Sequence, residues 1–281
     1  MKLALLGIVI NVFLSAIKLL SGYFGHSYAL IADGIESSLD IAGSFIIWGG
    51  LKLAAKPADA DHPYGHGKAE PMAAIIVAFG VLVAALGLAA QSVFQIFQPR
   101  HAPAPFTLIV LVVVVVIKET LYRIVMWHGN KAESTAIKTD AMHHRSDALT
   151  SVAAFVGISI ALVKGTGWEA ADNWAALFAC VLIAYNGVKL IKPAIYEIMD
   201  TAPPKNFENG VRKAAQSVEG VANVEQCRIR KMGLEFYVDL HVWVDGGMSV
   251  LEGHNIAHSV KDAVRDSNPA IADVLVHIEP H

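Results

Sequence analysis

Six long apolar stretches separated by short polar loops occupy the first 190 residues of the chain. A helix of about 20 apolar residues spans the hydrocarbon core of a bilayer. Each stretch is close to that length or exceeds it, so we expect a multi-span α-helical membrane protein. Its six transmembrane helices are expected over residues 3–23, 28–53, 72–97, 106–126, 135–163 and 174–190.

Basic residues fall mostly on one side of this arrangement. The loops after the second, fourth and sixth helices, with the adjoining helix ends, carry Lys52, Lys56, Lys68, Lys131, Lys138, Lys189 and Lys192. The opposite loops carry only Arg100 and Lys164. Because cytoplasmic loops are enriched in lysine and arginine, both termini are expected in the cytoplasm.

The apolar pattern ends near residue 192. Pro203 and Pro204 cannot continue a helix. We therefore expect a membrane domain over 1–192, a linker over 193–204 and a soluble domain over 205–281.

The soluble part alternates helix and strand signals. A helix is expected over 207–217, a hairpin over 226–231 and 234–244, a helix over 249–266 and a last strand over 271–278. Apolar side chains alternate through the second strand, and Ser249 with Glu252 forms a capping box. The order αββαβ predicts a small cytoplasmic α+β domain with its helices packed on a three-stranded sheet.

Composition supports the membrane assignment and excludes some functions. The 281 residues are 54% hydrophobic and 17% charged, with a mean hydropathy of +0.48. The net charge of -3 gives no sign of a nucleic-acid partner. Cys180 and Cys227 form no motif, so neither a disulfide framework nor a thiolate metal site is predicted. An intramembrane hydrolase would need a general base in a metal-binding helix motif, and the sequence has none, so no enzyme is expected.

Ionisable residues interrupt two of the apolar helices at matching positions. Glu36 and Asp40 lie four residues apart, as do His143 and Asp147, so each pair shares one helix face. Each pair falls about 13 to 20 Å along its expected helix, which is halfway through the bilayer. Such charges are expensive unless they pair or bind a cation, and they usually mark an ion pathway.

A polar helix interface, in which these four side chains only bond to one another, is the alternative. The fourth helix also carries Lys118, Glu119 and Arg123. For these we expect snorkelling towards the membrane surface, or a local arrangement at a helix end.

Two further groups of potential ligands lie outside the helices. The loop after the second helix holds Asp59, His62 and His66 among glycines and prolines, a spacing that can wrap a small cation. The alternative is a solvated loop whose histidines bind nothing.

The soluble domain also contains histidines on different elements. His241 points away from the expected core, His254 and His258 share a helix face, and His277 and Glu279 share a strand face. These residues could assemble into a metal site, or they could be exposed histidines that bind nothing. The sequence favours the two interpretations equally.

Taken together, these motifs resemble the cation diffusion facilitator family, in its bacterial ferrous-iron and zinc efflux form. The resemblance covers essentially the whole chain and includes the segment His-Pro-Tyr-Gly-His-Gly-Lys-Ala-Glu-Pro at residues 62–71. It implies a homodimer that exports divalent cations from the cytoplasm, at the inner membrane if the cell is bacterial, in exchange for protons. It also implies a metallochaperone-like (ferredoxin-like) carboxy-terminal domain for metal sensing and dimerisation.

The resemblance assigns sites residue by residue. The transport site would be Glu36, Asp40, His143 and Asp147, the loop site Asp59, His62 and His66, and the regulatory site some of His241, His254, His277 and Glu279. Lys68 and Asp200 would form a charge interlock. Glu225 stands where some relatives have histidine.

Three oxygen donors and one nitrogen at the transport site suit Zn²⁺ and tolerate Fe²⁺, Co²⁺, Cd²⁺ or Mn²⁺. These cations are expected as substrate and regulator, and no prosthetic group is expected. A metal sensor or assembly partner that keeps the fold without transporting is the alternative function.

Overall fold

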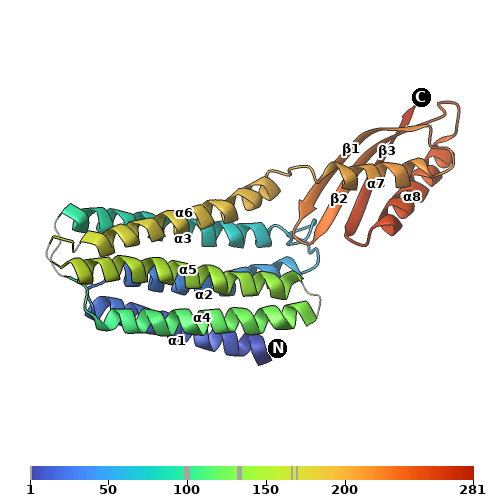
Figure 1. Ribbon diagram of the computed structural model, residues 1–281. Helices are drawn as coiled ribbons and strands as arrows, with labels where there is room; N and C mark the ends of the chain where they lie inside the picture. Colours follow the sequence, from blue (N-terminus) through green and yellow to red (C-terminus); the bar gives the residue numbers. More distant parts are fainter. Residues whose placement is uncertain (1, 98–101, 132–134, 166, 169) are drawn as a thin grey trace. The chain divides into compact units, whose positions relative to one another are not determined.

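The computed structural model describes residues 2–97, 102–131, 135–165, 167–168 and 170–281. They divide into two compact units. One contains residues 1–46 and 76–190, and the other contains residues 47–75 and 191–281. Each unit is described in turn (Figure 1).

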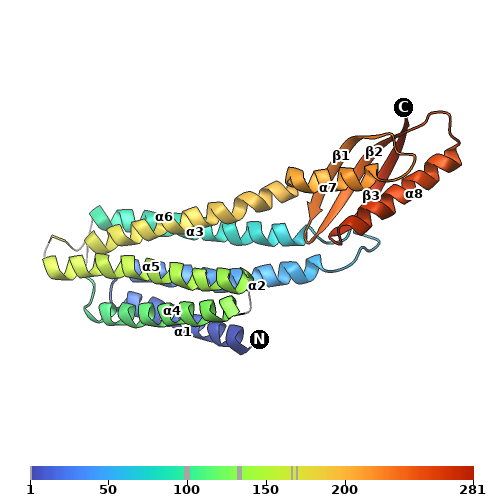
Figure 2. The same ribbon diagram turned by 45° about the vertical axis from the view of Figure 1, so that its right-hand side comes forward.

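Six helices build the first unit and extend partly into the second, as the apolar pattern predicts. They are α1 (Lys2–Phe24), α2 (Tyr28–Ala54), α3 (Ala69–Phe97), α4 (Phe106–Lys131), α5 (Thr135–Lys164) and α6 (Ala170–Ile198). Helix α4 packs along α5 and also contacts α1, and both views show these three helices side by side (Figure 1, Figure 2).

The outer faces of these helices carry large apolar side chains. Phe79, Leu86, Val116 and Val163 are each more than half exposed. By length and hydropathy, three described segments qualify as membrane spans: Ala69–Phe97, Asp147–Lys164 and Ala170–Ile198. Helices α2 and α4 are long enough, but ionisable residues in their apolar sequences lower their hydropathy or raise their charge count.

A buried carboxylate from α6 caps the start of α2. Asp172, at the start of α6, accepts hydrogen bonds from the Ser27 hydroxyl at 2.7 Å and from the Tyr28 amide at 2.6 Å. The first amides of a helix have no partner within the helix, and an acceptor there stabilises its end. Asp172 thus ties the starts of α2 and α6 together.

The second unit contains the predicted αββαβ order: α7 (Lys205–Gln216), β1 (Asn223–Met232), β2 (Glu235–Val244), α8 (Val250–Ser267) and β3 (Ile271–Pro280). The sheet has the order β1-β2-β3, with β1 antiparallel and β3 parallel to β2. Val238, Leu240, Val242 and Val244 are buried, which confirms the alternation of β2. The capping box of Ser249 and Glu252 is present.

Helix α6 runs through Pro193 to Ile198. The linker expected over residues 193–204 therefore begins as helix, and its non-helical part starts at Met199. The end of α2, the loop over residues 55–68 and the start of α3 also belong to the second unit.

Candidate metal centres

Three of the four predicted transport-site side chains are described. Glu36 and Asp40 lie on α2, and Asp147 lies on α5. Glu36 and Asp147 are buried, and Asp40 and Asp147 are near enough to act electrostatically on Glu36. The Oε2 atom of Glu36 has no hydrogen-bond partner among the described residues. His143 belongs to α5, but its side chain lies outside the described residues.

A lysine engages Asp147. The Lys118 ammonium on α4 donates to Asp147 Oδ2 at 2.6 Å and to Asn11 Oδ1 on α1 at 2.9 Å. Lys118 is 2% exposed. The snorkelling expected for Lys118 is therefore wrong, because its charge is satisfied inside the bundle. Glu119 and Arg123 pair with each other at 2.8 Å across one turn of α4, rather than between adjacent residues as expected.

A second buried lysine neutralises an acid one turn before Glu36. Lys18 on α1 is completely buried and donates to Asp33 Oδ1 at 2.9 Å and to the Ser37 hydroxyl at 3.1 Å. Asp33 also accepts from the Ser151 hydroxyl at 2.7 Å, which links α2 to α5. The sequence analysis missed Lys18. Its signal was available, since an isolated lysine in an apolar helix is as unusual as an isolated acid.

Two of the acids on α2 and α5 are paired with lysines. Lys18 pairs with Asp33, and Lys118 pairs with Asp147. Several carboxylates within apolar helices are a suitable setting for a divalent cation. Among the described side chains, however, the oxygen atoms of Glu36, Asp40 and Asp147 do not all lie within 4.8 Å of one another. The structure therefore does not gather these three carboxylates around one point.

The loop cluster is assembled as predicted. Donor atoms of Asp59, His62 and His66 all lie within 4.8 Å of one another. Asp59 Oδ1 accepts from the His62 amide at 2.7 Å, and Oδ2 lies 3.5 Å from His66 Nε2. The hydrogen bond from the His62 amide lowers the pKa of Asp59, and the two histidines lower it further. An ionised carboxylate beside two imidazoles is a suitable ligand set for a small divalent cation.

This loop packs against the β1–β2 hairpin within the second unit. The Tyr64 ring lies 5.5 Å from the Arg230 guanidinium, and the Tyr237 hydroxyl donates to the Tyr64 carbonyl at 3.3 Å. A Cβ atom on Gly67 would lie 2.4 Å from the Met232 carbonyl oxygen, so only glycine allows this close approach. Lys68 and Asp200 form the expected ion pair at 3.0 Å.

A third cluster lies on the open face of the sheet. His241 and His277 are neighbours in the register of β2 and β3, and their donor atoms lie within 4.8 Å of each other and of Glu279. His241 Nδ1 lies 2.6 Å from Glu279 Oε1. The hydrogen bond with His241 lowers the pKa of Glu279, which therefore stays ionised at neutral pH.

Two neighbouring residues change the predicted composition of this cluster. Glu225 lies at the bulge that shifts the β1–β2 register, and it lines the same hollow as His241 and Glu279. His254 does not belong to the cluster among the described residues; its ring instead lies 4.6 Å from that of His258 on α8.

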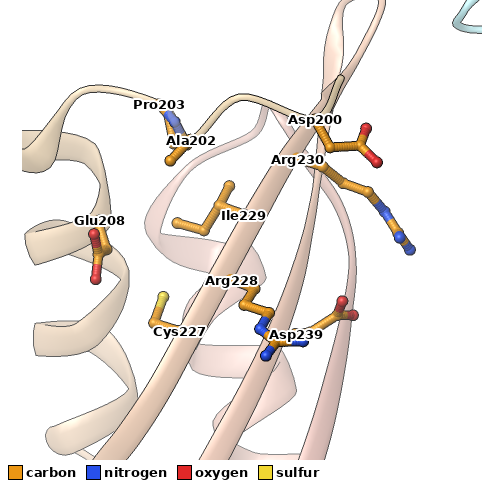
Figure 3. Close-up of a pocket in the computed structure, with 9 residues that line it drawn as sticks. All are labelled: Asp200, Ala202, Pro203, Glu208, Cys227, Arg228, Ile229, Arg230 and Asp239. Atoms are coloured by element: carbon orange, nitrogen blue, oxygen red, sulfur yellow. The ribbon is translucent and has the colours of Figure 1, made fainter. Parts of the chain in front are cut away.

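Beside the sheet, a hollow of about 340 Å³ lies between the linker, α7 and β1 (Figure 3). Its walls carry both charge signs, including the cross-strand partners Arg228 and Asp239, so it selects neither anions nor cations. Burial raises the pKa of Cys227 in this hollow to about 11. The thiol is protonated at neutral pH and is a poor metal ligand, in line with the expected absence of a thiolate site.

Two protein families match consecutive parts of the chain. The cation efflux transmembrane domain matches residues 4–199. The cytoplasmic domain of cation efflux proteins matches residues 203–281. Both parts of the chain are thus accounted for by domains of one kind of protein.

Individual relatives match over the full length. The manganese efflux system protein MneP of Bacillus subtilis is 28% identical over 284 residues, which cover 100% of this chain and 96% of MneP. The uncharacterized transporter MJ0449 of Methanocaldococcus jannaschii is 32% identical over 279 residues, covering 99% and 97%. Metal tolerance protein C1 of Arabidopsis thaliana is 30% identical, and this chain spans 62% of its length. A solved MamM-CTD variant is 28% identical over 27% of this chain and 96% of its own, with a TM-score of 0.27.

Proposed function

The chain belongs to the cation diffusion facilitator family of cation efflux transporters, and on that premise we propose that it exports divalent cations from the cytoplasm in exchange for protons. The transport site we propose is Glu36, Asp40, His143 and Asp147. The observation that carries it is the buried Glu36 carboxylate, whose Oε2 has no hydrogen-bond partner among the described residues while Asp40 and Asp147 lie in electrostatic range. Buried acids in a membrane helix without compensation are expensive, and a divalent cation compensates them.

The donor set defines the class of cation. Three carboxylates and one imidazole suit Zn²⁺, Fe²⁺ and Mn²⁺ and disfavour Cu⁺, which prefers sulfur ligands. MneP is named as a manganese efflux protein, so Mn²⁺ belongs among the substrates to be tested. Competition among these cations for transport identifies the preferred one.

Exchange for protons follows from ligand chemistry. A cation binds only deprotonated ligands, so loading releases protons and unloading takes them up. His143 is the proposed proton carrier, because histidine ordinarily titrates near neutral pH. Rocking of α2 and α5 around a site halfway through the membrane would expose it to each side in turn.

The two cytoplasmic clusters are proposed as regulatory sites in a homodimer with both termini in the cytoplasm. In each cluster the donor atoms lie within 4.8 Å of one another, and the residues are exposed or half-buried. A cation bound there biases the transport cycle if it binds one arrangement of the dimer more tightly than another.

The test is cation flux in vesicles that contain the purified protein. We expect Asp147→Asn and Asp40→Asn to reduce flux of Mn²⁺ and Zn²⁺ at least about a hundredfold, because each removes a charged ligand of a buried cation. Asp61→Asn, at an exposed acid of the loop outside all three clusters, is the matched control and should transport normally.

Normal flux in Asp147→Asn would refute the transport site. Absence of flux in the wild-type protein, with cations still bound, would instead support a non-transporting metal sensor or assembly partner.

A further inference from the structure

Lys118 brings an ammonium group to the proposed transport site. Its ammonium is held by oxygens from two other helices, Asp147 Oδ2 on α5 and Asn11 Oδ1 on α1. Helices α1, α4 and α5 lie side by side in both views (Figure 1, Figure 2). The side chain is 2% exposed, so water does not screen this charge.

A cation bound by Asp147 would meet this ammonium. Ligand bonds to a divalent cation are about 2 Å long, so a cation on the other Asp147 oxygen would lie roughly 5 Å from the Lys118 nitrogen. Two positive charges at that separation repel strongly where water is excluded. Cargo binding and the Lys118–Asp147 ion pair therefore oppose each other.

We propose that Lys118 is a tethered counter-cation that occupies Asp147 when the transport site is empty and lowers the affinity of that site for its cargo. This rests on the transport site proposed above, and it makes Lys118 a positioning residue rather than a ligand. The pair keeps Asp147 neutralised in the empty protein, where an unpaired buried carboxylate would be costly. It also weakens the loaded state, and a transported ion must be bound loosely enough to leave.

The second buried lysine pairs with an acid outside the proposed ligand set, and it acts on the proposed ligand Glu36 only through its charge. Lys18 faces Asp33, which lies outside the proposed ligand set and already accepts hydrogen bonds from the Ser151 and Thr150 hydroxyls. The ion pair of Lys18 holds helices together, whereas that of Lys118 involves a proposed cargo ligand.

The test measures Mn²⁺ and Zn²⁺ binding to the full chain carrying His62→Ala and His241→Ala, which remove the two cytoplasmic clusters. In this background we expect Lys118→Gln to tighten binding at least about fivefold, because the repulsion is gone. Lys118→Arg keeps the charge and should stay within about twofold of the parent. Binding that is weaker or unchanged in Lys118→Gln would overturn the proposal.

A double substitution tests whether the effect acts through Asp147. With Asp147→Asn already present, Lys118→Gln should tighten binding by less, because the ion pair that competes with the cargo for Asp147 is already absent. Tightening of the same size in both backgrounds would overturn the proposal. This double variant contains no unpaired charge at the two positions.

Two further results keep the proposal testable and separate it from the transport site. If Lys118→Gln does not fold, Asn11→Asp replaces it. A second carboxylate beside the ammonium draws Lys118 away from Asp147, so cation binding should tighten. Unchanged binding would contradict the proposal.

In vesicles, Lys118→Gln should lower both KM and kcat. If Asp147→Asn abolishes flux and Lys118→Gln leaves KM unchanged, only the role of Lys118 fails. If Asp147→Asn transports normally, the transport site fails.

Discussion

Two lysine–aspartate pairs of nearly equal length lie in opposite surroundings. Lys18 and Asp33 are joined at 2.9 Å with side chains 0% and 2% exposed. Lys68 and Asp200 are joined at 3.0 Å with side chains 36% and 44% exposed. The two N–O distances are nearly equal, so the main difference between the pairs is their exposure to solvent. In water an ion pair contributes little to the free energy of unfolding. Inside a membrane bundle, loss of one partner leaves the other charge buried and unpaired, which is strongly destabilising.

The same contrast separates the candidate metal centres. Inside the helices, Asp33 and Asp147 are held by lysines, and the described carboxylates of the proposed transport site are not gathered around one point. In the two histidine clusters, Asp59 and Glu279 are held by histidines, and the donor atoms lie within 4.8 Å of one another. The buried centre therefore pairs its acids with lysine, and the other two pair theirs with histidine, which is the more common metal ligand.

The largest effect is expected at the buried pair. Lys18→Met leaves Asp33 charged and unpaired, and should lower the free energy of unfolding by about 3 to 5 kcal/mol. The measurement is the thermal unfolding midpoint of the purified protein in detergent. Adding Asp33→Asn removes the stranded charge and should restore much of the loss. A loss below about 1 kcal/mol for Lys18→Met would mean that water reaches this pair.

The difference between these surroundings also explains what could be predicted from the sequence. The six helices and the αββαβ order follow from apolar periodicity, turn residues and the Ser249 capping box, all of which are local signals. The cluster of Asp59, His62 and His66 was predictable in the same way, because its ligands lie close in sequence. For the cluster on the sheet, the sequence predicted only that His277 and Glu279 share a strand face, and His241 joins them from another strand.

The counter-charges were not predictable in that way. Lys118 and Asp147 are 29 residues apart in the sequence, and Lys18 and Asp33 are 15 residues apart. Only the packing of the helices shows which acid pairs with each lysine. Glu225 lies at a bulge in β1 and lines the same hollow as Glu279. No pattern in the sequence marks that bulge.

An intermediate effect is expected at the histidine cluster on the sheet. Trp243 is the neighbour of Glu279 in the register of β2 and β3, so Zn²⁺ bound there should change tryptophan fluorescence. Lowering the pH from 7.5 to 5.5 should weaken this binding about a hundredfold, because protons compete with Zn²⁺ for two imidazole nitrogens. The lowered pKa of Glu279 keeps its carboxylate charged over this range, so the loss comes from the histidines. Trp243→Phe should abolish the signal. Unchanged affinity at pH 5.5 would remove the histidines from the ligand set.

The smallest effect is expected at the exposed pair, and it completes the comparison. Lys68→Ala removes an ion pair that has the length of the Lys18 pair and is open to water, so it should lower the free energy of unfolding by about 1 kcal/mol or less. It is measured as for Lys18→Met, and high salt should reduce the difference from the wild-type protein further. A loss of several kcal/mol, insensitive to salt, would mean that this pair is shielded from water in the assembled protein. If a second copy of the chain covers the pair, diluting the protein to the monomer should reduce the loss of unfolding free energy to about 1 kcal/mol or less. The reason is that an interface stabilises the protein only while both copies are bound.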